Sequence, residues 1–413
     1  MLKKHLQYQK TKISDQAQSG AEELLFNSRS LAPILTNYSG PCFVYDLDLV
    51  QERFLALKNA LPHVSVHYAL KANPSSEILK RLKSLGCRID AVSGGEIQRA
   101  FECGFEPRDI LFSGVAKTQK EIEFAVESQI HQINVESLSE LKRIADICSK
   151  MKKKISVALR LNPDVEIQTH KYIATGLLEN KFGLELASLP DLLNVLKQSP
   201  WVVLSGVSLH LGSQMLEFSG LREGIRKTRA CFGELRRQFP TCQRFDFGGG
   251  IGIFYEEVNP ARELQILADY ALVIQQELAD FVQEGIEIQA EPGRWLVAHA
   301  GILVCQVQYI KETAQKTFVI TDSGMNHLIR PALYEAYHWI TPWILRDSKT
   351  QIVDVVGPIC ESSDFFSRSR PLSIVKENDF LVIADCGAYG ASMSSDYNLQ
   401  ARAKEIFLAQ AMD

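Results

Sequence analysis

Eight short, mainly apolar runs recur between about residues 64 and 291, separated by polar or glycine-rich breaks and by longer segments with helical apolar spacing. Strands that alternate with helices predict a parallel sheet, and eight such units favour a closed β/α barrel over an open sheet. The expected strands are 64–70, 87–92, 110–113, 132–135, 155–161, 204–210, 244–247 and 286–290, and the expected helices include 121–128, 138–151, 221–238 and 262–284.

After Pro292 the pattern changes to strand-like runs without long helices between them, at 302–310, 317–321, 351–356 and 379–384. This change predicts a second, mainly antiparallel β-domain. The expected division is an N-terminal segment over 1–40, a barrel over 41–297 and a β-domain over 298–413, with the N-terminal segment as a candidate addition to the β-domain. Residues 21–26 suggest a helical turn, and the extreme N-terminus is expected to be mobile.

Composition excludes several classes of protein. The chain has 413 residues, of which 46% are hydrophobic and 23% charged, as in ordinary globular proteins. Its net charge of -4 offers no general field for nucleic acid, and it shows neither a signal peptide nor an apolar stretch of membrane-spanning length, so we expect a cytoplasmic protein. Nine cysteines without a C-x-x-C spacing argue against a disulfide framework, and no metal site is expected.

In a β/α barrel the active site lies at the carboxyl ends of the strands, so polar residues at those ends are the candidates for chemistry. The first expected strand leads into Lys71, where burial would keep the amine uncharged and reactive toward an aldehyde. A surface lysine is the more common interpretation of such a position when it is considered alone. The residues at the other strand ends change that balance.

Two further strand ends carry suggestive residues. The seventh strand leads into Gly248, Gly249 and Gly250, and a glycine turn at this place in a barrel commonly holds a phosphate through backbone N–H groups. The eighth leads to Glu291 and Arg294. A buried glutamate can keep a pyridine nitrogen protonated, although a simple Glu–Arg salt bridge is about equally plausible.

The sixth expected strand ends at His210, and Ser213 follows it. An imidazole can stack on a flat ring and a hydroxyl can bind phosphate, whereas a hydrogen-bonded core histidine is the plainer interpretation of His210. A lysine, a phosphate turn, a carboxylate and a stacking imidazole at one barrel mouth together indicate a pyridoxal phosphate site.

From about Gly40 to about Ile406 the chain resembles the fold-type III pyridoxal-phosphate decarboxylases, which join a β/α barrel to a β-domain, and among them it is most similar to the diaminopimelate decarboxylases. The resemblance rests on the segments YALKANP (68–74), HKYIATG (170–176), KFG (181–183), GGG (248–250), EPGR (291–294), CESSD (360–364) and GAYG (387–390). The implied activity is decarboxylation of meso-2,6-diaminopimelate to L-lysine and CO2, the last step of lysine biosynthesis.

The same resemblance implies roles at the cofactor. Lys71 would bind pyridoxal phosphate covalently, His210 would stack on its ring, and Glu291 would pair with its pyridine nitrogen. The remaining implied cofactor residues are Ser213, Gly248, Gly249, Gly250, Gly293, Arg294 and Tyr389.

For the substrate, the resemblance implies Arg294, Arg330, Tyr334, Glu361 and Tyr389. The two arginines would grip the distal carboxylate, which distinguishes diaminopimelate from lysine, and Glu361 would hold the distal ammonium. Cys360 is implied as the proton donor. It would act in a homodimer, in which the segment around Cys360 reaches into the active site of the neighbouring subunit.

Other functions stay open at this point. The same cofactor could serve decarboxylation of ornithine, arginine, D-lysine, D-ornithine or carboxynorspermidine, and a catalytically silent homologue that binds a protein partner is a third possibility. The HKYIATG segment and the paired arginines favour a distal carboxylate, although His170 could equally serve loop packing. Ser208 departs from the family, since many relatives have a second histidine there, and so does the Ser362-Ser363 pair, where a Ser-Gly is commoner.

Overall fold

The computed structural model describes residues 5–10, 21–165, 181–256 and 260–409. The chain divides into two compact units. The barrel unit comprises Arg53–Ile253 and Leu264–Trp295, and the β-unit comprises Met1–Glu52, Phe254–Glu263 and Leu296–Asp413.

The barrel unit is a closed barrel of eight parallel strands, as predicted, in the order β10-β11-β12-β5-β6-β7-β8-β9. Its strands are β5 (Val64–Ala69), β6 (Arg88–Ala91), β7 (Ile110–Phe112), β8 (Gln132–Val135), β9 (Ile155–Arg160), β10 (Val202–Ser208), β11 (Arg244–Asp246) and β12 (Glu287–Ala290). Only the expected strand 204–210 is displaced, since β10 begins and ends two residues earlier.

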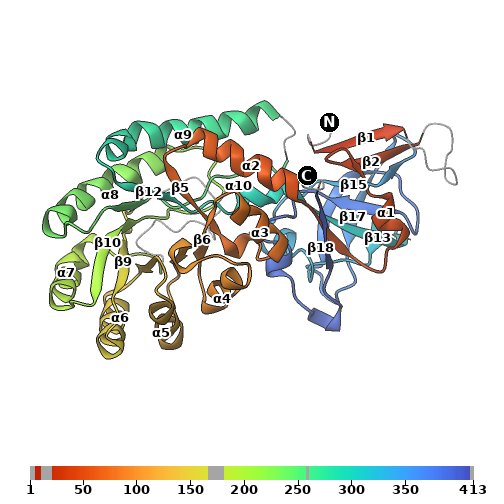
Figure 1. Ribbon diagram of the computed structural model, residues 1–413. Helices are drawn as coiled ribbons and strands as arrows, with labels where there is room; N and C mark the ends of the chain where they lie inside the picture. Colours follow the sequence, from red (N-terminus) through yellow and green to blue (C-terminus); the bar gives the residue numbers. More distant parts are fainter. Residues whose placement is uncertain (1–4, 11–20, 166–180, 257–259, 410–413) are drawn as a thin grey trace. The chain divides into compact units, whose positions relative to one another are not determined.

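Helices surround these strands on the outside (Figure 1). They are α2 (Leu47–Ala60), α3 (Ser76–Ser84), α4 (Gly94–Glu102), α5 (Gln119–Ser128), α6 (Leu138–Met151), α7 (Leu189–Gln198), α8 (Ser219–Gln238) and α9 (Pro260–Gln283). The single turn α10 (Arg294–Val297) follows β12 at the carboxyl end of the barrel. Local sequence sets several of the starts, because Ser93, Thr118 and Ser137 each accept a hydrogen bond from the backbone N–H three residues further on.

The barrel interior contains a chain of buried polar side chains. The Ser205 hydroxyl donates to Gln132 Oε1 over 3.2 Å, and Gln132 Nε2 donates to Asn134 Oδ1 over 2.8 Å. Because buried polar groups are tolerated only when they are hydrogen-bonded, this chain holds its members in fixed orientations. It reaches Asn134 near the carboxyl end of the barrel.

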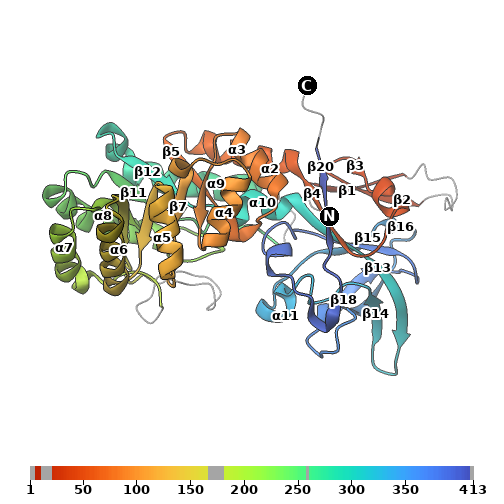
Figure 2. The ribbon, with the colours of Figure 1, turned by 60° about the horizontal axis from the view of Figure 1, so that its bottom comes forward.

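The β-unit is mainly antiparallel, as predicted, and contains two sheets. The larger has the order β15-β19-β13-β14-β17-β18, with β4 paired to β13 and β20 paired to β4, and Figure 2 shows β13 and β14 as a long hairpin. Its strands are β4 (Cys42–Asp46), β13 (Gly301–Glu312), β14 (Thr317–Thr321), β15 (Ile340–Pro342), β17 (Thr350–Val356), β18 (Phe365–Ser373), β19 (Phe380–Ile383) and β20 (Lys404–Leu408).

The smaller sheet contains β1 (Leu6–Lys10), β2 (Glu22–Phe26), β3 (Arg29–Ser30) and β16 (Ile344–Leu345), and two short helices, α1 (Ala32–Thr36) and α11 (Arg330–Tyr334), complete the unit. The expected helical turn at 21–26 is therefore wrong. Residues 22–26 pair with both β1 and β16, so cross-strand hydrogen bonds outweigh the local helical preference. The expected mobility of the extreme N-terminus concerns residues outside the described ranges. Across the described residues, no helix is both long and apolar enough to cross a membrane.

Candidate active site

Lys71 lies in the 3-10 turn Leu70–Ala72, which directly follows β5, so its amine is at the carboxyl end of the barrel. Its two neighbours in the turn are buried, whereas Lys71 is exposed. The burial expected for this lysine is not found, because the chain's own atoms leave it accessible. Burial raises the pKa of Asp90 and lowers that of His210, and the charge of Lys71 opposes the first shift and adds to the second.

Glu291 follows β12 and is buried at the same end of the barrel. Its Oε1 atom accepts hydrogen bonds from Asn134 Nδ2 (3.3 Å) and from the Ser113 hydroxyl (3.5 Å). Burial, followed by the negative charges of Asp246 and Asp90, raises the pKa of Glu291 well above its ordinary value. A carboxyl group that keeps its proton here can share that proton with a ring nitrogen.

His210 lies two residues beyond the end of β10 and faces Glu291. Its Nδ1 atom is 3.8 Å from Glu291 Oε2 and accepts a hydrogen bond from the Gly249 backbone over 3.3 Å. Burial lowers the pKa of His210, and the charges of Lys71 and Arg160 lower it further. The side chain is therefore a neutral imidazole, which suits packing against a flat aromatic ring.

The glycine turn after β11 is required by the packing of the strand-end loops. Gly248 and Gly250 have φ angles of 73° and 97°, where L-residues are disfavoured. A Cβ on Gly249 would lie 2.1 Å from the Glu291 carbonyl oxygen, which is backbone and cannot yield. The N–H groups of Gly248 and Gly249 donate to Asp246 Oδ1 and His210 Nδ1, so the expected role of this turn toward a phosphate stays a prediction.

Arg294 begins α10, is buried, and donates from Nη2 to the Ser213 hydroxyl over 3.1 Å. The contact joins the loop after β12 to the loop after β10. Gly293 packs against the lysine turn, since a Cβ there would lie 3.2 Å from the Cβ atoms of Ala69 and Ala72. The EPGR segment thus connects the predicted carboxylate to the turn that carries Lys71.

Sequence reasoning missed the polar residues beneath this cluster. Asp90 and Asp246 are fully buried, and burial raises the pKa of Asp246 to about 7. Ser113 and Asn134 support Glu291, and Arg160 forms an ion pair with Glu136 at 2.5 Å. Their position could have revealed them, because all of them except Glu136 lie within the last three residues of an expected strand, near the edge where the named candidates stand.

The KFG segment lies against the same end of the barrel. The Gly183 N–H donates to Glu136 Oε2 over 2.8 Å, and the Arg160 guanidinium lies 5.1 Å from the centre of the Phe182 ring. The neighbouring HKYIATG segment falls outside the described residues, so the prediction for His170 stays open.

The remaining predicted residues belong to the β-unit. Arg330 begins helix α11 and is buried, and Tyr334 ends the same helix. Arg330 Nη1 donates to the Tyr255 hydroxyl over 3.1 Å. Cys360 and Glu361 are exposed in the loop between β17 and β18, and Tyr389 has a φ of 59° after β19.

A second cluster of titratable side chains surrounds His299 in the β-unit. Its Nδ1 is 2.5 Å from Asp385 Oδ1 and its Nε2 is 2.9 Å from Glu263 Oε1, and His5 Nε2 lies 3.5 Å from Asp385 Oδ1. Two ligands of one tetrahedral zinc ion would stand roughly 3.3 Å apart. The 2.5 Å separation therefore fits a proton between His299 and Asp385 better than a metal ion. Burial alone would lower the pKa of His299, but the two carboxylates raise it.

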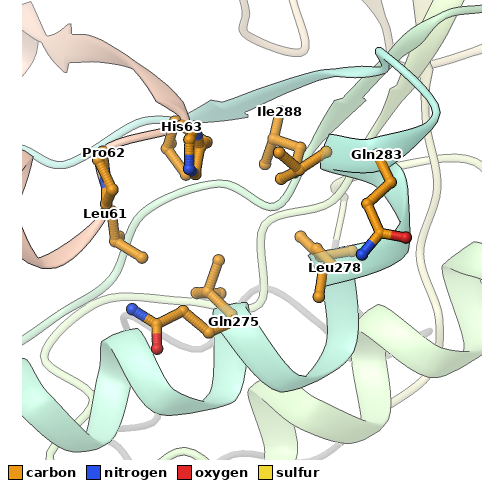
Figure 3. A pocket seen from close by; sticks show the side chains of 11 residues that line it. Leu61, Pro62, His63, Gln275, Leu278, Gln283 and Ile288 are labelled. Carbon is orange, nitrogen blue, oxygen red and sulfur yellow. The ribbon is translucent and has the colours of Figure 1, made fainter.

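A cavity of about 270 Å³ lies at the opposite end of the barrel, beside the first residues of β5 and β12. Figure 3 shows its apolar lining, including Leu61, Leu278 and Ile288, with Gln275 and Gln283 at its edge. Catalytic groups of barrels stand at the carboxyl ends of the strands, so this cavity is no candidate for the chemistry.

The residues at the carboxyl end fit pyridoxal phosphate. A primary amine, a neutral imidazole and a buried carboxyl group that retains a proton are what the aldehyde, ring face and pyridine nitrogen of this cofactor require. The fit depends on the barrel unit alone, in which all three groups lie.

Comparison with known proteins gives the same result. Residues 47–298 match the family described as "Pyridoxal-dependent decarboxylase, pyridoxal binding domain". Curated diaminopimelate decarboxylases of Aquifex aeolicus and Campylobacter jejuni are 38% and 39% identical to this chain, covering 94% and 90% of it and 90% and 92% of their own lengths. The crystal structure of Helicobacter pylori diaminopimelate decarboxylase complexed with L-lysine is 38% identical, with a TM-score of 0.85 over 92% of this chain and 94% of that one. With identities this high over nearly the whole length, the chain belongs to the diaminopimelate decarboxylase family of pyridoxal-dependent decarboxylases.

Proposed function

We propose that this protein decarboxylates meso-2,6-diaminopimelate to L-lysine and CO2. The observation that carries the proposal is the exposed Lys71 amine at the mouth of the barrel, beside the contact between His210 and Glu291. The similarity to diaminopimelate decarboxylases along almost the entire chain, one of them solved with L-lysine, supports the choice of substrate.

At the cofactor, Lys71 would form the covalent attachment and the neutral imidazole of His210 would pack against the ring. When bound, pyridoxal phosphate supplies the electron sink that accepts the electron pair left by departing CO2. Glu291 would hold a proton at the pyridine nitrogen, as its raised pKa allows. Ser213, the glycine turn and Tyr389 would bind the phosphate.

At the substrate, Arg294 and Arg330 would bind the distal carboxylate and Glu361 the distal ammonium, with Tyr334 and Tyr389 as further contacts. This assignment has a physical reason, because lysine lacks that carboxylate and a guanidinium pairs with it through two parallel hydrogen bonds. Both arginines are buried, which strengthens their interaction with an anion.

Cys360 would return a proton to the carbon that loses CO2. Its accessibility supports this role, because Cys360 is exposed whereas seven of the nine cysteines are buried. The homodimer, in which each Cys360 segment reaches the other subunit's site, remains a proposal from the family resemblance. The cytoplasmic location remains a proposal from the sequence.

The test is release of CO2 from meso-diaminopimelate, L-ornithine, L-arginine, L-lysine and D-lysine, with pyridoxal phosphate present and Lys71→Ala as the control. We expect release from meso-diaminopimelate only, and none from the control. Comparable activity on a substrate without a distal carboxylate would contradict the roles given to Arg294 and Arg330.

A further inference from the structure

The turn Tyr397–Leu399 has a strained backbone. Asn398 and Leu399 both have a φ of 56°, in the left-handed region. Asparagine tolerates this region, but leucine is disfavoured there because its Cβ approaches the following carbonyl oxygen. Leu399 is 94% exposed, so burial of its side chain does not compensate for the strain. Strain of this kind persists where surrounding contacts hold it, often at functional sites.

Two side chains of this turn contact the Cys360–Glu361 segment. Asn398 Oδ1 accepts a hydrogen bond from the Cys360 backbone N–H over 3.0 Å, and the Tyr397 hydroxyl donates to Glu361 Oε1 over 2.6 Å. The pKa of Tyr397 is raised mainly because its hydroxyl donates this hydrogen bond to Glu361. The turn therefore holds both the backbone at Cys360 and the carboxylate at Glu361.

Asp364 holds the same loop from its other side. Its Oδ2 atom accepts from the Ile359 N–H and its Oδ1 atom from the Met325 N–H, each over 2.6 Å. Asp364 is buried, so this anchor is firm, whereas Cys360 and Glu361 are exposed. An exposed carboxylate would otherwise sample several rotamers, and the contact with Tyr397 selects one of them.

We propose that Tyr397 and Asn398 are positioning residues for the decarboxylation. Tyr397 orients the Glu361 carboxylate toward the distal ammonium of the substrate, and Asn398 fixes the backbone from which the Cys360 thiol delivers its proton. This inference rests on the proposed function and adds two residues to it. Hydrogen bonds at exposed sites contribute little to folding, but misplacement of a reacting group by about 1 Å can slow a reaction by two orders of magnitude. The two residues should therefore affect kinetics more than stability.

The first experiment compares Tyr397→Phe with Tyr309→Phe in the holoenzyme. Tyr309 is an exposed tyrosine on β13 and serves as the matched control. Loss of the Tyr397 hydroxyl should raise KM for meso-diaminopimelate about fivefold, leave kcat within about twofold and leave the melting temperature unchanged. In a Glu361→Ala background, which removes the acceptor, Tyr397→Phe should have no further effect, because it acts through that carboxylate. A wild-type KM in Tyr397→Phe, or full additivity with Glu361→Ala, would overturn the role of Tyr397.

The second experiment separates backbone strain from the hydrogen bond at Asn398. Asn398→Gly keeps the left-handed backbone accessible but removes the acceptor, and we expect kcat to fall about tenfold with little change in KM. Asn398→Asp keeps an acceptor oxygen and should restore kcat to within about twofold. Asn378, another left-handed asparagine of the β-unit with a φ of 72°, provides Asn378→Gly as the control, which should behave as wild type. Equal kcat values for Asn398→Gly and Asn398→Asp would overturn the role of Asn398.

Failure of this inference is distinguishable from failure of the proposed function. A wild-type protein that releases no CO2 from meso-diaminopimelate refutes the proposed function. An active wild type in which Glu361→Gln raises KM but Tyr397→Phe does not refutes only the role of Tyr397. An active wild type in which Glu361→Gln leaves KM unchanged refutes the roles of both Glu361 and Tyr397.

Discussion

Replacement of Asp246 by asparagine should stabilise the apoprotein in a pH-dependent manner. Asp246 is fully buried, and burial is the largest cause of the rise of its pKa from 3.8 to about 7. This rise corresponds to about 4 kcal/mol between the two protonation states, as an upper figure, because neighbouring carboxyl groups titrate together with it. Asparagine keeps the oxygen that accepts the Gly248 N–H and removes the ionisable group.

The direction of this pH dependence follows from the protons that Asp246 binds in the folded and unfolded states. Between pH 4 and pH 7 folded Asp246 retains its proton whereas the unfolded chain loses it, so the stability present at pH 4 declines as the pH rises and the loss is complete above pH 7. The asparagine variant lacks this decline. Its gain in unfolding free energy over wild type should therefore be larger at pH 8 than at pH 5, by up to about 3 kcal/mol.

The assay is urea unfolding of both apoproteins at pH 5 and pH 8, followed by tryptophan fluorescence. Trp201 and Trp295 report on the barrel unit. Asp191→Asn, at an exposed position in the first turn of α7, is the control and should show no such difference. If Asp246→Asn were equally stable relative to wild type at both pH values, or less stable at pH 8, the electrostatic account of the buried carboxyl cluster would be wrong.

Three further predictions concern other parts of the chain. Lys71→Ala should lose CO2 release and the absorbance band of bound cofactor. Its apoprotein should melt within about 2 °C of the wild-type apoprotein, because the side chain is exposed; a large drop in melting temperature would show a structural role. His299→Gln should destabilise the protein more at pH 6 than at pH 9 in urea unfolding, since the raised pKa of His299 gives stability that is lost as the pH rises through it. An equal loss of unfolding free energy at both pH values would refute a protonated His299 in the folded protein. Gly249→Ala should cost about 3 kcal/mol or more, because its Cβ would meet the Glu291 carbonyl oxygen at 2.1 Å, and a wild-type melting temperature would contradict this.

The sequence alone predicted the barrel, the mainly antiparallel β-unit and the strand ends that carry Lys71, the glycine turn and Glu291. These features are local, because strand and helix periodicity can be read within about ten residues. Parallel strands in a barrel also bring all their carboxyl ends to one edge without further information. Local reasoning failed at residues 22–26, where pairing with strands β1 and β16 decided the conformation.

Only the tertiary structure determined how the candidate residues are held. Glu291 depends on Asn134, which is 157 positions away, and the contact of Asn398 with Cys360 spans 38 positions. Asparagine and serine at strand ends or in turns are common, so their residue types gave no signal for these contacts. The protonation of the buried carboxyl groups was equally beyond the sequence, because it depends on burial and on neighbouring charges that the closure of the barrel brings together. The sequence thus located the chemistry along the chain, and packing determined the orientation and charge of its groups.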